Sequence, residues 1–297
     1  MDNMNYALIT PAKNEEDHIE KTLASVTAQS ILPRRWVIVS DGSTDRTDQI
    51  VARYAKRHDF IRLLRRESGS YCFGSKVHAI RAGYSELHDL SFDFIGNLDA
   101  DIELPANYYE RLLHHFAEDA RLGLTGGAQH DLRNGKFVRV RFNELNIGGA
   151  YQLFRRTCYE DIEGYMPLEM GGEDTIAGIM ARHRGWRVQA FPDIKVLHYR
   201  PAGASQGNLI RVGFRNGKRN FLMGYHPLFE IVRLMRVERP TQILHNVSEL
   251  VGFTTSAARG FKRQVSQDVV DYLRAEQLSR LKHTFLRGHD PASGTRT

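Results

Sequence analysis

Two short apolar runs lie near the start of the chain, YALIT at residues 6–10 and WVIVS at residues 36–40. A polar cluster follows each run, PAKNE at 11–15 and DGSTD at 41–45, and apolar residues at helical spacing fill the chain between them. A buried strand, a helix and a second buried strand are typical of a parallel sheet whose strands are joined by crossover helices. This segment therefore predicts an α/β fold.

The same alternation continues outward from this segment. We expect strands at residues 6–10, 36–40, 60–64, 92–98, 122–129, 137–142, 150–154, 186–190 and 195–198, with Asn134-Gly135 suited to a hairpin turn. We expect helices at about 15–28, 45–57, 75–87, 105–116, 174–184, 228–239, 243–253 and 267–285. The sequence thus predicts an α/β domain at 1–200, a basic, mainly helical region at 201–288 and a disordered tail at 289–297.

The 297 residues are 41% apolar and 26% charged, which is the composition of a globular protein. Residues 1–200 hold 26 Lys and Arg against 28 Asp and Glu, so most of the cationic excess lies in the last third of the chain. A basic region of this kind indicates an anionic partner, either a membrane surface, a nucleic acid or a diphosphate. We expect no nucleic acid partner, because the basic region carries no recognised reader motif.

Cysteine content and hydropathy bear on the cellular compartment. Cys72 and Cys158 are too few for a disulfide framework, and neither lies in a cluster typical of structural zinc. No stretch has the roughly 20 apolar residues that a membrane-spanning helix needs, and the first residues carry an acid where a secretory signal needs a cation. We therefore expect a cytoplasmic protein, with peripheral attachment to the inner face of the membrane as a further expectation.

Polar clusters follow three of the expected strands, at residues 10–15, 41–45 and 99–101. Ligands bind at the carboxyl edge of an open parallel sheet, beside a switch in strand order. Each cluster alone is also ordinary turn chemistry, so their convergence at one edge is what indicates a binding site. The first loop lacks the glycines of a dinucleotide fingerprint, and a Walker A loop is absent from the sequence.

The carboxylates of these clusters suggest a nucleotide and a cation. Asp41 is placed either to accept hydrogen bonds from a nucleotide or to cap the following helix. Asp99 and Asp101 are two apart in a segment expected to be extended, so both would point to one side and suit Mg²⁺ or Mn²⁺. Glu173 and Asp174 start an expected helix about 100° apart, so either one of them faces a reaction centre or both merely interact with the helix N-terminus.

Five segments together resemble family 2 glycosyltransferases, which have the GT-A fold and use nucleotide sugars: LITPAKNE at 8–15, TLAS at 22–25 with Gln29, VIVSDGSTD at 37–45, LDAD at 98–101 and GGED at 171–174. They occur in order over roughly residues 5–200. The resemblance implies a Rossmann-like GT-A domain with a mostly parallel sheet, followed by a C-terminal helical extension. It also implies an enzyme that transfers a sugar from a nucleoside diphosphate to an acceptor hydroxyl.

The resemblance also implies roles for residues at the donor. Pro11, Asn14 and Glu15 would border the nucleotide, and Asp41 would bind its base. Lys76 corresponds to a basic residue near the donor. These five positions, with Asp99, form the expected donor site.

Further roles concern the metal and the chemistry. Asp99 and Asp101 would form the metal-binding D-x-D motif, with Asp101 the more direct ligand, and His198 matches a third ligand of Mn²⁺ or Mg²⁺. A structural role for His198 is the alternative. Asp174 matches the acid that deprotonates the acceptor hydroxyl, and direct attack by that hydroxyl would invert the anomeric centre.

Two departures from the family refine these expectations. The chain lacks the QxxRW motif and the membrane spans of processive polysaccharide synthases, which favours transfer of one sugar at a time. A glycine-interrupted basic loop, with Arg211, Arg215, Lys218 and Arg219, would contact the diphosphate in place of that motif or would simply be solvated. A sugar nucleotidyltransferase, or a nucleotide-sugar-binding protein without transferase activity, is the alternative function; a nucleotidyltransferase would be expected to have a glycine-rich first loop.

The helices around Pro240 have apolar faces flanked by cations, namely Arg233, Arg236, Arg239, Arg259, Lys262 and Arg263. Such faces either pack against the rest of the protein or lie in the plane of an anionic membrane. Membrane attachment would bring a lipid-linked glycan acceptor within reach. The sugar, the nucleotide base and the acceptor are not specified by the sequence.

Overall fold

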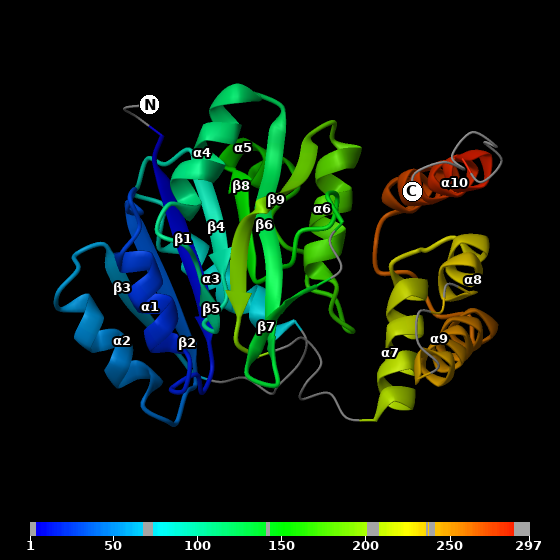
Figure 1. The fold of residues 1–297 in the computed structure, drawn as a ribbon, viewed down its shortest axis with the longest axis horizontal. Coiled ribbons are helices and arrows are strands. Elements are labelled where there is room, and N and C mark those ends of the chain that lie inside the picture. The colour runs from blue at the N-terminus through cyan, green and yellow to red at the C-terminus, as the bar shows by residue number, and fades with distance from the viewer. Residues whose placement is uncertain are drawn as a thin grey trace, which may run out of the picture. The chain divides into compact units, whose positions relative to one another are not determined.

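The computed structural model describes residues 4–67, 74–140, 143–200, 208–235, 237 and 241–287. The chain divides into two compact units, Met1–Ala202 and Gly203–Thr297 (Figure 1). The strands are β1 (Tyr6–Ala12), β2 (Arg35–Asp41), β3 (Ile61–Arg66), β4 (Phe94–Leu98), β5 (Ile102–Glu103), β6 (Leu122–Arg133), β7 (Lys136–Arg139), β8 (Tyr151–Arg155) and β9 (Arg187–His198). The helices are α1 (Ile19–Thr27), α2 (Thr47–Ala55), α3 (Ser75–Ser85), α4 (Tyr108–Glu118), α5 (Arg156–Asp161), α6 (Glu173–His183), α7 (Leu209–Leu222), α8 (Pro227–Met235), α9 (Thr241–Ala258) and α10 (Gln267–Arg287).

The strands of the first unit form one sheet in the order β3-β2-β1-β4-β8-β6-β9-β5, with β7 paired to β6. Strands β3, β2, β1 and β4 are parallel. The strand order switches at β1, because β2 and β3 lie on one side of it and β4 on the other. Such a switch opens a crevice at the carboxyl ends of the strands.

The buried strand β2 shows why this half of the sheet forms. Its residues Trp36 to Val39 are fully buried, as expected for a parallel strand that is covered on both faces. Helices α1 and α2 lie on one face of the sheet and α3 on the other (Figure 1). Helix α3 approaches closely because Gly83 has no side chain: an added Cβ would lie 2.6 Å from the Ile9 side chain. The α/β fold predicted from the sequence is confirmed.

The second half of the sheet differs from the expectation in detail. Strands β4 and β8 are antiparallel, as are β8 and β6. The expected hairpin is confirmed, since Asn134 and Gly135 join β6 to β7 with φ angles of 49° and 75°. The short elements β5 and α5 were not expected, and of the strand expected at 137–142, residues 141 and 142 lie outside the described part.

The expectation of two separate strands at 186–190 and 195–198 is wrong, because β9 is continuous from Arg187 to His198. The pairing with β6 shifts register where Gly126 opposes Ala190 and Ala128 opposes Lys195. Residues 191–194 bulge at this point, and Gly127 makes room for them, since an added Cβ would lie 2.3 Å from the Ile194 carbonyl oxygen. A proline in the bulge interrupts the strand pattern in the sequence without ending the strand.

In the second unit, the expectation of a basic loop is wrong, because residues 209–222 form α7. Gly213 and Gly217, two of the glycines that suggested a loop, are contact points between α7 and α9, as is Gly252 of α9. An added Cβ would lie 2.5 Å from the His245 carbonyl oxygen at Gly213, 1.8 Å from that of Glu249 at Gly217, and 2.1 Å from that of Phe214 at Gly252. Close packing of the two helices outweighs the roughly 1 kcal/mol that each glycine costs a helix.

A buried polar cluster lies between α7, α8 and α9. The Asn220 amide donates to Glu230 and Glu249, at 3.1 and 3.0 Å. The Arg233 guanidinium donates to both carboxylates, at 2.9 and 2.5 Å. Glu230 and Glu249 are buried, and each is paired. Arg233, one of the cations that flank the apolar faces in the sequence, therefore forms its ion pairs inside the unit.

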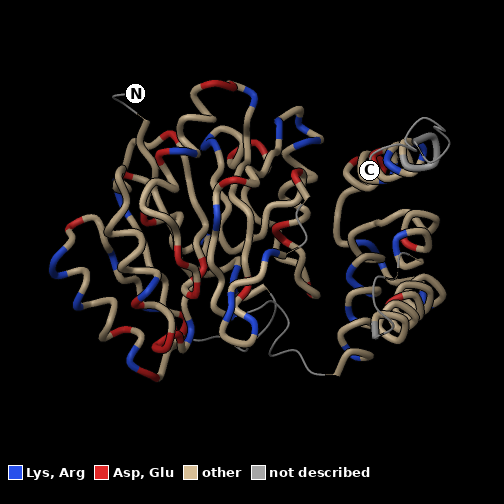
Figure 2. The backbone as a smooth tube through the Cα atoms, viewed as in Figure 1, with Lys and Arg blue, Asp and Glu red and all other residues tan. Residues whose placement is uncertain are grey.

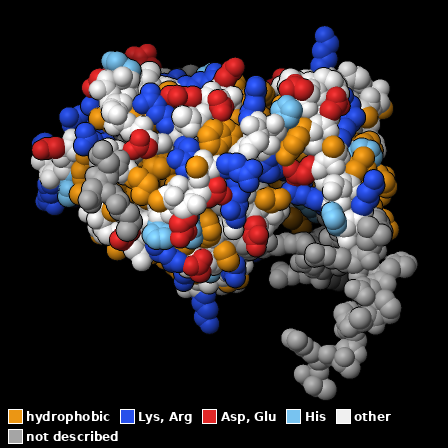
Figure 3. All heavy atoms as spheres, turned by 90° about the horizontal axis from the view of Figure 1, so that it is seen from above, with side chains coloured by type: hydrophobic (Ala, Val, Ile, Leu, Met, Phe, Trp, Pro, Cys, Tyr) orange, Lys and Arg blue, Asp and Glu red, His pale blue; other side chains and the backbone are white. Residues whose placement is uncertain are grey.

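Charged residues are distributed unevenly over the elements. Acidic residues gather at the carboxyl ends of β1, β2 and β4, whereas α7 carries cations and no acid (Figure 2). On the face shown in Figure 3, both signs of charge are interspersed. Among the described residues, no helix has the length and apolar content required to traverse a lipid bilayer. Arg236, Arg239 and the tail expected at 289–297 lie outside the described residues.

Candidate active site

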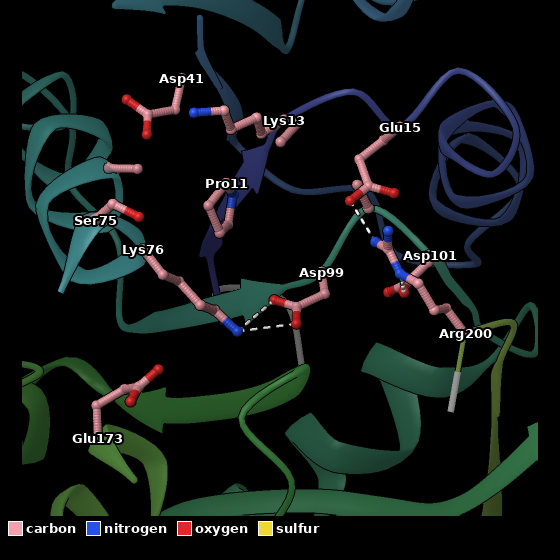
Figure 4. A pocket seen from close by; sticks show the side chains of 13 residues that line it. Pro11, Lys13, Glu15, Asp41, Ser75, Lys76, Asp99, Asp101, Glu173 and Arg200 are labelled. Carbon is pink, nitrogen blue, oxygen red and sulfur yellow. Dashed lines mark hydrogen bonds and ion pairs between the residues drawn. The ribbon is translucent and has the colours of Figure 1, made fainter. Parts of the chain in front are cut away.

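A pocket of about 280 Å³ lies at the switch point of the sheet. Residues from the ends of β1, β2, β4 and β9 and from the starts of α3 and α6 line it, so segments far apart in the chain meet there (Figure 4). The lining side chains are those of Pro11, Ala12, Lys13, Glu15, Asp41, Ser75, Lys76, Ala79, Asp99, Ala100, Asp101, Glu173 and Arg200. Six of the sequence-predicted site residues belong to this set: Pro11, Glu15, Asp41, Lys76, Asp99 and Asp101.

Asn14 joins the loops that follow β1 and β2. Its φ of 55° is in the left-handed region, which asparagine tolerates better than most residues. The Asn14 side-chain oxygen accepts a hydrogen bond from the Thr44 backbone N–H at 2.8 Å, and the Ser43 hydroxyl accepts one from the Asn14 N–H at 3.2 Å. Asn14 is not among the residues that line the pocket. Its hydrogen bonds instead hold together the two loops that form the pocket.

Asp41 faces the pocket and does not cap α2. Its carboxylate lies 3.9 Å from the Arg66 guanidinium. The N–H of Thr47, in the first turn of α2, donates instead to Asp45 at 3.0 Å. Of the two sequence interpretations of Asp41, the capping one is therefore wrong.

Lys76 and Asp99 form an ion pair within the pocket (Figure 4), with Nζ 2.7 and 2.8 Å from the two carboxylate oxygens. Burial raises the pKa of Asp99, and the positive charge of Lys76 opposes that effect. Burial lowers the pKa of Lys76, but Asp99 and Glu173 outweigh it, so the net direction is upward. Lys76 is therefore a charged ammonium held among carboxylates.

Asp101 has a different set of partners. Its Oδ2 lies 3.5 Å from His198 Nε2 and 3.3 Å from Arg200 Nε. Burial acts to raise the pKa of Asp101, but hydrogen bonding and charge from His198, with the charge of Arg200, bring it below its usual value. The prediction that residues 99–101 are extended is wrong, because Ala100 and Asp101 form a turn. As a result, Asp99 pairs with Lys76, whereas Asp101 lies beside His198 and Arg200. Both nevertheless line the same pocket.

His198 is buried between two carboxylates. On the side away from Asp101, its Nδ1 lies 3.2 Å from Asp131 Oδ1. Gln129 and Arg133 hold Asp131 in turn, at 2.7 and 3.0 Å. Burial lowers the pKa of His198, but hydrogen bonding to Asp101 and Asp131 reverses the direction and raises it. Asp131 was missed in the sequence, because nothing marks one acid of a long strand as the partner of a histidine 67 residues later.

Of the two acids at the start of α6, Glu173 lines the pocket, whereas Asp174 is not in its lining. Burial raises the pKa of Glu173, and Lys76 opposes that effect. Each oxygen of Asp174 accepts a backbone hydrogen bond, Oδ2 from Gly149 at 3.0 Å and Oδ1 from Thr175 at 2.8 Å. The sequence singled out Asp174, and it could not show that its neighbour enters the pocket.

Arg200 is a second pocket residue that the sequence reasoning missed. It bridges Asp101 and Glu15, while the second Glu15 oxygen is buried without a hydrogen-bond partner. Its position two residues after His198 on β9 was the available signal. Arg215 and Arg219, expected to contact the diphosphate, lie on α7 in the second unit, and their role stays a prediction.

Asp99, Asp101 and His198 have the side-chain types that bind divalent cations. Among the described residues, no group of three or more His, Cys, Asp or Glu side chains is arranged as a complete metal site. Asp101 and His198 nevertheless converge within 3.5 Å, and Asp99 lines the same pocket. Mg²⁺ at nucleotide sites uses one or two carboxylates and completes its shell with phosphate oxygens and water, and Mn²⁺ accepts both carboxylate and imidazole ligands.

The fold is the GT-A fold of nucleotide-sugar-dependent glycosyltransferases. It resembles the mannosyltransferase PcManGT from Pyrobaculum calidifontis in complex with GDP-Man and Mn²⁺, with a TM-score of 0.56 and 17% identity over 96% of this chain and 81% of that one. It also resembles residues 1–349 of S. aureus TarS in complex with UDP-GlcNAc, with a TM-score of 0.55 and 16% identity over 93% of this chain and 80% of that one. The predicted GT-A domain with C-terminal helices is confirmed.

Sequence comparison defines the family. Residues 7–165 match the family described as Glycosyl transferase family 2, so the chain belongs to that family and the sequence-based assignment is confirmed. The chain is also 27% identical over 201 residues to the poly-beta-1,6-N-acetyl-D-glucosamine synthase of Staphylococcus aureus strain MSSA476, which covers 60% of this chain. The chain spans about half the length of the curated relatives it matches, 46% in this case.

Proposed function

We propose that the protein is an inverting glycosyltransferase that moves one sugar from a nucleoside diphosphate sugar to an acceptor hydroxyl. The observation that carries the proposal is the pocket that brings Asp41, Asp99 and Asp101 together with Lys76 and Arg200 at the switch point of the sheet. The structural neighbours hold GDP-Man or UDP-GlcNAc, which supports the same class of donor here. Family membership favours a transferase over a sugar nucleotidyltransferase.

In this proposal, the loops after β1 and β2 bind the nucleotide. The Asp41 carboxylate accepts hydrogen bonds from the base or ribose, and Pro11 and Glu15 border the same space. The Glu15 oxygen that lacks a partner would accept a hydrogen bond from a hydroxyl group of the nucleotide sugar. Asn14 holds the two loops in place relative to each other, because its side chain accepts a hydrogen bond from the Thr44 N–H.

Replacing Asp41 tests this assignment. Asp41→Asn is expected to weaken binding of the nucleoside diphosphate about tenfold to a hundredfold, because a hydrogen bond to a charged acceptor contributes about 1.5 to 3 kcal/mol. Isothermal titration with the free diphosphate measures the change. Asp89→Asn is the matched control, since Asp89 also pairs with an arginine, Arg35, but lies outside the pocket lining. Equal affinities of both variants and the unmodified protein would contradict the role of Asp41.

The opposite end of the pocket would stabilise the departing diphosphate. Asp101, Asp99 and His198 would hold Mg²⁺ or Mn²⁺, which supplies electrostatic stabilisation of the negative charge that develops on the leaving group. Lys76 and Arg200 add fixed positive charge at the same place. Their present carboxylate partners keep these cations ordered before the donor binds.

Asp174 is the proposed base. It would take the proton of the acceptor hydroxyl, while that hydroxyl attacks the anomeric carbon on the face opposite the diphosphate and inverts it. Two backbone hydrogen bonds fix the orientation of its carboxylate. They leave lone pairs on both oxygens for the incoming proton.

Asp131 is proposed to orient His198 as a metal ligand. It lies 3.2 Å from Nδ1, where it would accept the Nδ1 proton and leave Nε2 available on the side of Asp101. Asp131→Asn is expected to lower Mn²⁺ affinity about 10- to 100-fold, as replacement of such supporting carboxylates does. Mn²⁺ titration followed by electron paramagnetic resonance, in the presence of a nucleoside diphosphate, measures it. Asp193→Asn, which changes an exposed acid on β9, the strand of His198, is the control. Unchanged affinity of Asp131→Asn would refute the role.

A donor screen tests the function as a whole. Several nucleoside diphosphate sugars are offered with Mn²⁺ or Mg²⁺, and release of the nucleoside diphosphate is measured with and without glycan acceptors. Metal-dependent release from one class of donor is expected, with inverted anomeric configuration in the product. Binding of donors without any release or transfer would instead support the alternative of a nucleotide-sugar-binding protein without transferase activity.

The acceptor is proposed to be a glycan, in keeping with the polymer named for the staphylococcal relative. We further propose that this glycan is carried on a lipid and that the enzyme acts in the cytoplasm, attached peripherally to the inner face of the membrane. The cationic excess of residues 201–297 supports this location, because the cytoplasmic leaflet is anionic.

A further inference from the structure

The second unit exposes an unusual number of large apolar side chains. Among the described residues, twelve of the fifteen exposed large apolar side chains lie in this unit: Leu209, Ile210, Phe214, Leu228, Ile231, Met235, Val237, Ile243, Leu244, Val247, Val251 and Phe261. Single exposed apolar residues are common on soluble proteins, but contiguous apolar patches mark interaction sites.

Seven of the twelve lie on two neighbouring helices. We call them the α7–α9 face: Leu209, Ile210 and Phe214 of α7, with Ile243, Leu244, Val247 and Val251 of α9. Five of the seven line one groove of about 580 Å³, together with Arg211. On α9 the exposed positions follow one stripe of the helix. Leu244 and Val247 are 56% and 54% exposed, so they contribute little to packing within the unit.

The packing of the two helices explains why the α7–α9 face is continuous. Gly213 and Gly217 of α7 and Gly252 of α9 bring the backbones into contact. Hydrogen bonds fix the first turn of α7 against α9, since the Ser248 hydroxyl donates to the Ile210 carbonyl at 2.6 Å. The apolar side chains that point away from this contact therefore stand side by side on the outside.

The charges around the α7–α9 face have one sign. Residues 208–264 contain ten Lys and Arg against three Asp and Glu, and α7 has four cations and no acid (Figure 2). The two acids of this segment that the structure describes, Glu230 and Glu249, are buried and paired with Arg233. Arg211, Arg259, Lys262 and Arg263 are exposed. Cations beside an apolar face complement an anionic surface that also has an apolar interior.

We propose that the α7–α9 face binds an anionic lipid bilayer, with its apolar side chains inserted at the boundary of the acyl chains and its cations among the headgroups. This deepens the proposed function by naming the partner and the surface of the peripheral attachment. A nucleic acid would use stacked aromatic side chains, whereas this face is mostly aliphatic. A second copy of the chain would bring two cationic surfaces together, which electrostatic repulsion opposes.

Vesicle sedimentation of the full chain tests the proposal. The protein is mixed with vesicles of phosphatidylcholine alone, or of phosphatidylcholine with an equal amount of phosphatidylglycerol. Binding is expected only to the anionic vesicles and is expected to weaken as salt is added. The double variant Leu244→Asn/Val247→Asn is expected to reduce partitioning at least about tenfold. Arg211→Gln is expected to reduce it about fivefold.

The matched control carries the same changes on the first unit. Val138 and Leu145 are exposed there, and Val138→Asn/Leu145→Asn is expected to bind vesicles as the unmodified protein does. Circular dichroism and thermal unfolding check that both double variants are folded. No binding to anionic vesicles, equal binding to both vesicle types, or undiminished binding of Leu244→Asn/Val247→Asn would each overturn the proposal, as would loss of a dimer in that variant without any vesicle binding.

The outcome is separable from that of the proposed function. Release of nucleoside diphosphate by transfer of the sugar to water requires no membrane, so Leu244→Asn/Val247→Asn is expected to retain it at the unmodified rate. Vesicle binding without release from any donor would refute the proposed transferase alone. Release without vesicle binding would refute the lipid surface alone.

Discussion

Asp101→Ala is expected to abolish sugar transfer and to remove the metal dependence of donor binding. Asp101 lies 3.5 Å from His198 Nε2, and it lines the pocket that would hold the diphosphate. A metal that stabilises a leaving diphosphate contributes several kcal/mol, so its loss should slow transfer on the order of a thousandfold or more. Donor release assays measure the rate, and isothermal titration with and without Mn²⁺ measures donor affinity.

Two further variants separate metal binding from a general loss of structure. Asp101→Asn keeps the side-chain shape but removes the negative charge, and it is expected to lose transfer as Asp101→Ala does. Asp59→Asn removes an exposed acid of the first unit and is expected to have no effect. If Asp101→Ala bound the donor with the same Mn²⁺ dependence as the unmodified protein, Asp101 would not be a ligand of the metal.

The first half of the sheet was predictable from the sequence because its strands are buried on both faces. Continuous apolar runs such as Trp36 to Val39 are typical of central strands that are covered on both faces. The second half was less predictable, since its pairing depends on contacts that are distant in sequence. The bulge of β9 contains a proline, so the sequence pattern predicts a gap between two strands, although pairing with β6 continues on both sides of the bulge.

For the site, the sequence predicted which segments meet but not how individual side chains point. The polar clusters after β1, β2 and β4 converge because the carboxyl ends of parallel strands share one edge. The directions of Asp99 and Asp101 depend on a turn that spacing alone could not reveal. Glycines in a sequence can indicate either a break in a helix or a close contact between two helices. In α7 they are contacts with α9, which the sequence of α7 alone does not reveal.

Asp174→Asn is expected to reduce transfer at least about a hundredfold while leaving donor affinity unchanged, since general-base catalysis contributes roughly 10²- to 10⁴-fold. Glu173→Gln is the matched variant at the neighbouring position. Because Glu173 lines the pocket and interacts with Lys76, its replacement is expected to weaken donor binding instead. Titration with the donor and single-turnover transfer rates distinguish the two effects.

The pH dependence of the rate identifies the base independently. Transfer falls at low pH when the base becomes protonated, and the fall is centred on the pKa of the group responsible. Burial raises the pKa of Glu173, so a rate limited by this glutamate would fall at a pH above the usual range of a glutamate, and Glu173→Gln would abolish the fall. If Asp174 is the base, Glu173→Gln retains the acidic fall in rate and Asp174→Asn loses it along with most of the activity. If the pH profile became flat in Glu173→Gln, the base would therefore be Glu173, the acid that lines the pocket, and not Asp174.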